Sequence, residues 1–104
     1  AESTVGTPYY VSPEVCDSRP YNLKADIWSL GIVFYELAAL QPPFKASNLV
    51  TLVLKILQAE PQPLPTEYGE EMQRVVEWTL KKSPMERPTC VQLLALPVVR
   101  SAVA

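Results

Sequence analysis

The stretch Asn22–Leu40, NLKADIWSLGIVFYELAAL, decides the fold of this 104-residue chain. One of its faces carries apolar side chains at helical spacing, namely Ile27, Leu30, Phe34 and Leu37. The other faces are filled by further apolar side chains, Trp28, Ile32, Val33 and Tyr35. A helix that is apolar on almost every side is typical of a buried element. This stretch is therefore predicted to be a central helix that is buried on all sides.

Helical spacing continues on both sides of the central helix, whereas strand-like alternation is almost absent. A helix capped by Ser47 or Asn48 is predicted, with one apolar face formed by Leu49, Leu52, Val53 and Ile56. The next is predicted from near Gly69, with one face formed by Met72, Val75, Val76 and Leu80. A last helix is predicted through Leu93, Leu94 and Leu96, ending near Pro97. The pattern indicates an all-α domain with irregular loops.

Prolines and small polar residues mark where these helices begin. The run Ser12-Pro13-Glu14 combines an N-cap, a first-turn proline and a first-turn acid, so a short helical turn is predicted there. Two stretches, Ser83–Glu86 and Thr89–Gln92, have the spacing of a capping box. Alternate prolines predict an extended connector over Gln58–Glu67. We find no internal repeat and no domain boundary, as expected for one domain.

Composition excludes several classes of site. The chain has no His and two Cys, so neither a four-ligand Cys/His zinc site nor histidine acid–base catalysis can be built from it. The net charge of −2 argues against a nucleic-acid surface. Cys16 and Cys90 are predicted to be buried, in a reducing compartment. The longest apolar stretch, Ile27–Leu40, is shorter than the ~20 residues of a membrane span, so we expect an intracellular, cytoplasmic chain with no membrane partner.

The residues by themselves show no catalytic constellation. The carboxylates are scattered, and no Ser, Cys or Lys has a base beside it in the sequence. The three glycines stand singly and form no phosphate-binding loop. Taken alone, these features indicate only a soluble helical domain.

The order of four short motifs gives more specific information about the fold and function. They are Gly6-Thr7-Pro8-Tyr9-Tyr10-Val11-Ser12-Pro13-Glu14, Asp26-Ile27-Trp28-Ser29-Leu30-Gly31, Pro42-Pro43-Phe44 and Arg87-Pro88-Thr89. In this order they closely resemble the lower lobe of a eukaryotic protein kinase, from about Ser3 to Pro97, with Ser-Pro-Glu in place of the usual Ala-Pro-Glu. Together with the leucine-rich Asn48–Leu57, the first motif resembles the NIMA-related serine/threonine kinases.

The resemblance implies the helical part of the C-lobe of the bilobal kinase fold, truncated within the activation segment. Residues 1–104 would then be a partial kinase domain. Residues 1–16 would form the end of the activation segment, 22–40 the central buried helix, and 47–97 the remaining C-lobe helices. Trp28 and Gly31 resemble packing residues, a large anchor and a small residue that allows close approach. Ser83 departs from the family pattern, in which an acid usually opens that turn.

Two roles implied by the resemblance concern charged residues. Glu14 resembles an acid that pairs with a distant arginine, for which Arg87 stands in the matching place, and a guanidinium can grip a carboxylate with two hydrogen bonds. The alternative is two unrelated surface charges. Asp26 resembles the acid that anchors the catalytic loop. Its alternative role, a favourable charge in the first turn of a helix, is compatible with the first.

The activation-segment motif carries the other implied roles. Thr7 resembles the residue whose hydroxyl contacts the catalytic aspartate and lysine, and Pro8, Tyr9, Tyr10 and Val11 resemble the pocket for the residue after the phospho-acceptor. The alternative is an ordinary turn. Ser3 and the neighbouring Thr4 occupy the place of an activating phosphate, which would add roughly −2 charge. Alternatively, both are simply solvated.

The parts that phosphoryl transfer needs are missing from the chain: a Gly-rich loop, a Lys–Glu pair, a catalytic-loop Asp and Asn, and a magnesium-binding Asp-Phe-Gly. The resemblance implies a parent protein that uses Mg-ATP and acts on Ser or Thr of protein substrates. The chain alone is expected to bind neither nucleotide nor metal. Its partners would be protein substrates and the missing N-lobe and catalytic loop. Two alternatives stay open, a pseudokinase scaffold and a self-standing helical interaction module.

Overall fold

The computed structural model describes residues 8–16 and 22–99, and every structural statement below concerns these two ranges. Within them all regular secondary structure is helical, which confirms the all-α prediction. The elements in chain order are η1 (Pro8–Tyr10), α2 (Pro13–Cys16), α3 (Leu23–Ala39), α4 (Leu49–Gln58), η2 (Thr66–Tyr68), α5 (Gly69–Thr79), η3 (Pro84–Glu86) and α6 (Cys90–Leu94). None of the described helices is long and apolar enough to cross a membrane.

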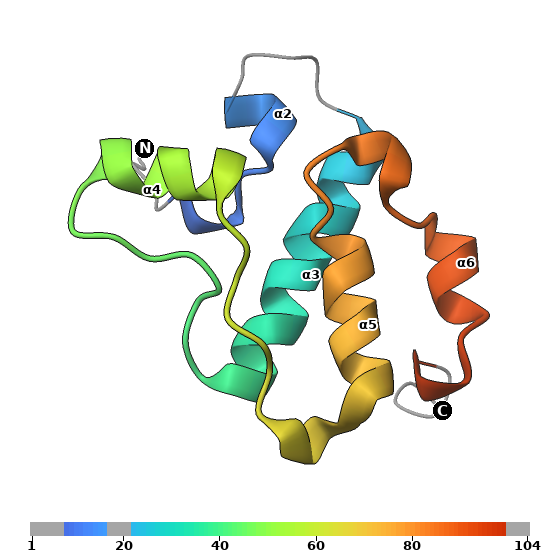
Figure 1. Ribbon diagram of the computed structural model, residues 1–104. Helices are drawn as coiled ribbons and strands as arrows, with labels where there is room; N and C mark the ends of the chain where they lie inside the picture. The colour runs from blue at the N-terminus through green and yellow to red at the C-terminus, as the bar shows by residue number, and fades with distance from the viewer. Residues whose placement is uncertain (1–7, 17–21, 100–104) are drawn as a thin grey trace.

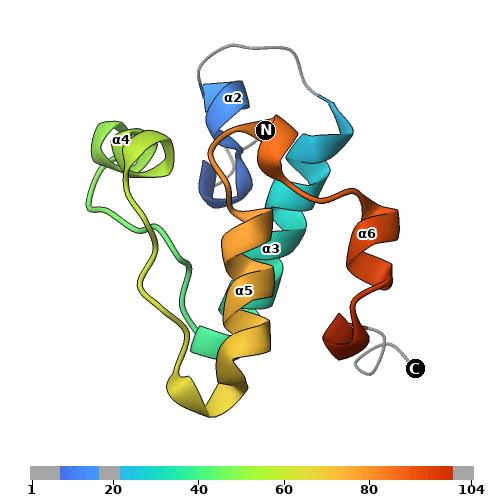
Figure 2. The same ribbon diagram turned by 45° about the vertical axis from the view of Figure 1, so that its right-hand side comes forward.

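Helices α3 and α5 form the centre of the molecule and run side by side in opposite directions (Figures 1 and 2). Gly31 lies where they meet: a Cβ atom there would stand 2.3 Å from the hydroxyl oxygen of Thr79. That hydroxyl donates to the carbonyls of Val75 and Val76, so it cannot easily turn away. The predicted role of Gly31, a small residue that allows close approach, is confirmed.

The core lies on two sides of α3. On one side Trp28, which is fully buried, stacks on Phe44 with 5.8 Å between ring centroids. The rest of this cluster is Ile32, Tyr35, Leu52, Ile56, Leu64, Val76 and Leu80. On the other side a smaller cluster contains Ile27, Val75, Leu93 and Val99. The anchor role predicted for Trp28 is confirmed, and α3 is the element that both clusters share.

A third side of α3 is uncovered, so the prediction of burial on all sides is wrong for the described chain. Its exposed apolar residues are Leu23, Leu30, Val33, Leu37 and Leu40, which we call the α3 stripe. Leu37 is 71% exposed. The reason is geometric: α5 and the two core clusters occupy the other sides of α3, and α6 stands beside α5 (Figures 1 and 2).

The predicted caps have mixed outcomes. Asn48, not Ser47, caps α4 by accepting from the backbone N–H of Thr51. The capping box of Thr89 and Gln92 is confirmed, with both of its hydrogen bonds present. The box predicted at Ser83 is wrong: its hydroxyl makes no cap bond. In that tight turn the backbone N–H of Glu86 is already donated to the Ser83 carbonyl.

The remaining local predictions concern a connector and two cysteines. The predicted connector Gln58–Glu67 is confirmed only between α4 and η2, where the chain has no regular secondary structure, because Gln58 ends α4 and Thr66 begins η2. The Tyr35 hydroxyl donates to the Gln62 carbonyl of this connector. Cys16 is partly buried, and burial is the main reason why its pKa is raised. Cys90 is exposed because it begins α6 at the surface, so the prediction that it is buried is wrong.

We predict that the isolated 104-residue chain self-associates through the α3 stripe. Fully burying one large apolar side chain is worth ~1.5–3 kcal/mol, against a net domain stability of only ~5–15 kcal/mol, so an uncovered stripe favours association. Light scattering should show oligomers, which Leu37→Glu should reduce. Met85→Glu is the control, because Met85 is even more exposed than Leu37 but lies off the stripe, in η3. A monodisperse wild-type monomer with a cooperative melt would contradict the prediction.

Candidate functional site

The structure brings Glu14 and Arg87 together, although they are 73 positions apart in the sequence. The two terminal nitrogens of Arg87 lie 2.8 and 2.7 Å from the two carboxylate oxygens of Glu14, a bidentate pair. Only 1% of Glu14 and 2% of Arg87 is exposed. The pair therefore joins α2 to the loop after η3 in the interior of the molecule, and is no surface contact.

Every N–H of the Arg87 guanidinium has an acceptor. Besides the two bonds to Glu14, it donates to the backbone carbonyls of Lys81 at 2.7 Å, Lys82 at 3.1 Å and Lys24 at 2.9 Å. A guanidinium has five N–H groups, so its hydrogen-bonding capacity is filled. The carbonyls belong to the start of α3 and to the loop after α5. One side chain thus connects the loop after α5 to α2 and to the start of α3, which are 73 and 63 positions from Arg87 in the sequence.

The electrostatics of Glu14 result from opposing effects. Burial is the largest and by itself would raise the pKa of the carboxyl. The hydrogen bonds from Arg87 and the backbone, together with the Arg87 charge, outweigh burial and hold the Glu14 pKa below its ordinary value of 4.5. Glu14 is therefore ionised at neutral pH, as the bidentate geometry requires.

A second cation lies close to the same tryptophan. The Arg87 guanidinium carbon is 5.0 Å from the Trp28 ring centroid, and the Lys82 Nζ is 5.3 Å from it. Lys82 also lies 4.4 Å above the Phe44 ring and donates to the Ile56 carbonyl at 2.7 Å, in the last turn of α4. Burial lowers the pKa of Lys82 to about 8.

The segment before α2 is tied to α3 by two hydrogen bonds. The Tyr10 hydroxyl donates to a carboxylate oxygen of Glu36 at 2.6 Å, and this bond is the main reason why the Tyr10 pKa is raised. The Ser29 hydroxyl donates to the Tyr10 carbonyl at 3.0 Å. Residues Pro8–Glu14 are thus fastened to α3 through Tyr10 and to the loop after η3 through Glu14.

The other predicted site residues have varied positions. Tyr9 is half-buried against the Trp28 cluster, and Val11, two positions further on, is half-buried. Asp26 lies at the surface in the first turn of α3, beside an apolar groove of about 500 Å³ that contains Leu30 and Cys90. Pro8 is described by its backbone only, in η1. Three of the predicted residues, Ser3, Thr4 and Thr7, lie outside the described residues.

A comparison with known families bears on this arrangement. The sequence model of the protein kinase domain matches residues 1–99. This chain belongs to the protein kinase domain family. Its match includes the Pro8–Glu14 segment and Arg87, so the kinase-like order of motifs is not a coincidence.

Relatives of this kinase chain are serine/threonine kinases. It is 43% identical over its full length to serine/threonine-protein kinase Nek5 of Mus musculus, covering 17% of that protein. It is 50% identical over 86% of its length to Nek3 of Mus musculus, covering 18%, and 46% identical over 96% to the G2-specific protein kinase nim-1 of Neurospora crassa, covering 12%. The resemblance to NIMA-related kinases is confirmed, and the chain spans less than a fifth of the length of these relatives.

Sequence reasoning missed the Tyr10 tether and the environment of Lys82. A signal for the tether exists: Ser29 and Glu36 are polar residues within the apolar stretch Ile27–Leu40, and they are seven positions apart, which places them on one helix face. For Lys82 there is no such signal, because Lys81 beside it has the same charge and lies exposed.

We predict that Arg87→Ala in the full-length protein destabilises the fold by ~3–5 kcal/mol, because it leaves the Glu14 charge buried and unpaired. Folded yield and melting temperature should both fall. Arg74→Ala is the control, since Arg74 forms an exposed pair with Glu70 in α5 that is worth at most ~0.5 kcal/mol. Equal melting temperatures for both variants would contradict the prediction.

The same pair predicts a pH dependence. Because the folded-state pKa of Glu14 lies below its ordinary value, the stabilisation is present above about pH 4.5 and is lost as the pH falls through the folded pKa. In Arg87→Met the buried carboxyl instead favours protonation. The stability difference between wild type and this variant should therefore shrink on acidification below pH 4.5, and a constant difference in melting temperature would contradict this.

Proposed function

We propose that this chain is the peptide-positioning and scaffold part of a serine/threonine protein kinase, which transfers the γ-phosphoryl group of ATP to Ser or Thr of protein substrates. The observation that carries the proposal is the Pro8–Glu14 segment, fastened through Tyr10 to Glu36 and through Glu14 to Arg87. A segment held at two points presents a fixed surface to a peptide, and a fixed surface is what orienting a hydroxyl for transfer requires.

Within the proposal each candidate residue has a role. The pocket for the residue that follows the phospho-acceptor is shaped by Pro8, Tyr9, Tyr10 and Val11. Thr7 contacts the catalytic loop. Asp26 anchors that loop at the start of α3. Ser3 or Thr4 accepts an activating phosphate. Glu14 and Arg87 act structurally, because both are buried and neither can touch a substrate.

Magnesium and ATP belong to the proposal but not to this chain. The described residues contain no group of three His, Cys, Asp or Glu side chains that could hold a metal ion. The three glycines of the whole sequence are isolated, so the chain offers no phosphate-binding loop. Neither magnesium nor ATP fits the residues present, so the remainder of the protein would have to hold them.

The proposal includes a location and a set of partners. An enzyme that consumes ATP works where ATP is supplied, so we place the protein inside the cell, in the cytoplasm. The unpaired Cys16 and Cys90 agree with a reducing compartment. The partners would be protein substrates and the rest of the same kinase.

The activity test uses the full-length protein with radiolabelled Mg-ATP and casein. We expect phosphoserine or phosphothreonine in the substrate, retention of activity in Thr7→Ser, and a large loss in Thr7→Ala, because only the hydroxyl is needed. The isolated chain should bind no Mg-ATP by calorimetry. A full-length protein that binds casein without phosphorylating it would identify a pseudokinase scaffold instead.

The tether predicts a specific defect. Tyr10→Phe removes the donor to Glu36, so the pocket is held less firmly and the KM for the protein substrate should rise several-fold, with a smaller change in the KM for ATP. Tyr68→Phe is the control, because Tyr68 has the same exposed fraction, 41%, and lies in η2, away from α2. Equal kinetics for the two variants would contradict a role of the tether in substrate binding.

A further inference from the structure

Two serines of this chain are directly followed by proline, Ser12 and Ser83. A serine–proline pair is the sequence that proline-directed protein kinases modify. Proline has no backbone N–H, so it fits a pocket in which that position finds no hydrogen-bond acceptor. The surroundings of the two serines in the folded chain decide which of them such an enzyme can reach.

Ser12 is inaccessible while α2 is folded. It is 2% exposed, and its carbonyl accepts from the backbone N–H of Cys16 at 3.0 Å, at the start of α2. Glu14, two positions further on, is also buried and carries the carboxylate that pairs with Arg87. A phosphate on Ser12 would add a second buried anion near this carboxylate, which the fold opposes.

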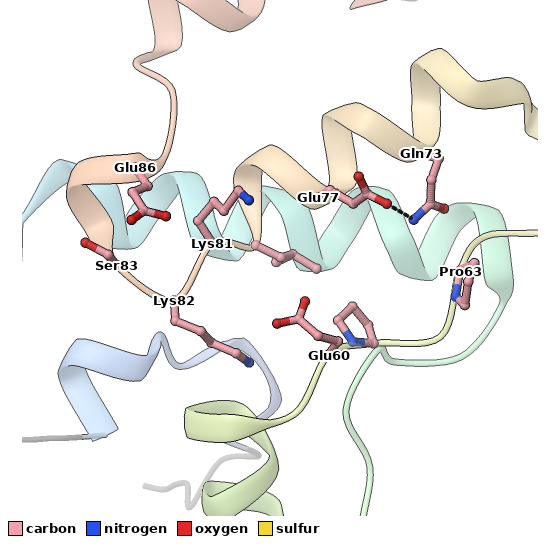
Figure 3. Close-up of a pocket in the computed structure, with 10 residues that line it drawn as sticks. Glu60, Pro63, Gln73, Glu77, Lys81, Lys82, Ser83 and Glu86 are labelled. Carbon is pink, nitrogen blue, oxygen red and sulfur yellow. Dashed lines mark hydrogen bonds between the residues drawn. The ribbon is translucent and has the colours of Figure 1, made fainter.

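Ser83 has the opposite surroundings. It is half-exposed and lies between Lys82 and Glu86, at one end of the wall of an open cavity of about 560 Å³ (Figure 3). Its hydroxyl makes no cap bond and has no other hydrogen-bond partner among the described residues. Its backbone is extended, with φ −82° and ψ 126°, as is usual before proline. The hydroxyl is therefore open to an enzyme that binds its substrate in extended form.

The short helix η3, which follows Ser83, is held by few contacts. The Glu86 N–H donates to the Ser83 carbonyl at 3.1 Å. The Arg87 N–H donates to the Pro84 carbonyl at 3.2 Å. Met85, in the middle of η3, is 89% exposed, and none of the three η3 residues belongs to a core cluster. An enzyme can therefore extend these residues without disturbing the core.

We propose that Ser83 is a phosphorylation site for a separate, proline-directed protein kinase that uses ATP. In the reaction the Ser83 Oγ attacks the γ-phosphorus of ATP and an O–P bond forms. The bond between this phosphorus and the bridging oxygen breaks, and ADP leaves with the electron pair. The serine proton passes to a base of the modifying enzyme. The products are phosphoserine and ADP.

The folded chain can hold this product. A phosphate would add roughly −2 charge to the turn. Two cations lie at the turn: Lys81 is exposed two positions before Ser83, and Lys24 donates from its Nζ to the Pro84 carbonyl at 3.4 Å. One carboxylate, that of Glu86, is exposed three positions after Ser83. Because these cations outnumber the acid, the turn attracts a phosphate.

The test incubates the folded full-length protein with Mg-ATP and a mitogen-activated protein kinase, which is proline-directed. Tandem mass spectrometry measures phosphate at Ser83 and Ser12, and a reaction without the added kinase is subtracted. Synthetic peptides of residues 6–18 and 77–89 give the rate of each sequence without the fold. Relative to its peptide, we expect Ser83 to react about tenfold faster than Ser12, which must wait for local unfolding. Equal relative rates, or no phosphate on Ser83, would overturn the proposal.

A pair of variants tests whether the modifying enzyme reads the proline. Pro84→Ala keeps the hydroxyl and removes the ring, so phosphorylation of Ser83 should slow several-fold. A looser turn would only expose Ser83 further, so a lower rate cannot result from lost structure. Pro63→Ala is the matched control, because Pro63 lies on the same cavity wall and does not follow a serine. Equal Ser83 rates in the two variants would overturn the assignment to a proline-directed enzyme. The activity of this protein itself does not enter the readout, so the outcome is independent of the proposed function.

Discussion

The Arg87 guanidinium is the interaction on which the arrangement of the chain depends. Its five N–H groups reach a carboxylate in α2, a carbonyl at the start of α3 and two carbonyls after α5. Lys24 returns the contact by donating from its Nζ to the Arg87 carbonyl at 2.8 Å. A buried charge is tolerated only when its desolvation is offset in this complete way. Any rearrangement that moved one of these segments would leave a donor unpaired, so the position of each is coupled to the others.

Trp28 is the corresponding central residue of the larger apolar cluster. Its ring packs on Phe44 and has the Arg87 guanidinium and the Lys82 ammonium within 5.3 Å of its centroid. Its indole N–H is buried and has no hydrogen-bond partner, which costs about 1–3 kcal/mol. Stacking on Phe44 and two nearby cations compensate for this cost. Trp28 is therefore part of the larger apolar cluster and also contacts the charged network around Arg87. Disruption of either group should also weaken the packing of the other.

Much of the fold could be predicted from the sequence because it depends on local chemistry. The spacing of apolar residues located α3, α4 and α5, and the Thr89–Gln92 box located the start of α6, since a helix start needs acceptors within a few residues. Two predictions failed because the spacing of residue types does not by itself decide which contacts form. Ser83 has the spacing of a cap, but the Glu86 N–H that its hydroxyl would have accepted from is donated to the Ser83 carbonyl in a tight turn. Leu37 looks like a core residue, but no described segment covers its side of α3.

The candidate site also contains residues that local sequence patterns could predict and residues that they could not. Glu14 and Arg87 could be named only through the resemblance to kinases, because 73 positions separate them and nothing local relates them. The Tyr10 tether needed only helix periodicity: Ser29 and Glu36 interrupt an apolar helix on one face, and a polar face on such a helix implies a polar partner. That partner is the segment that we propose to hold a peptide substrate. The polar residues of α3 therefore hold the candidate site and its apolar residues form the core, so both depend on the position of the same helix.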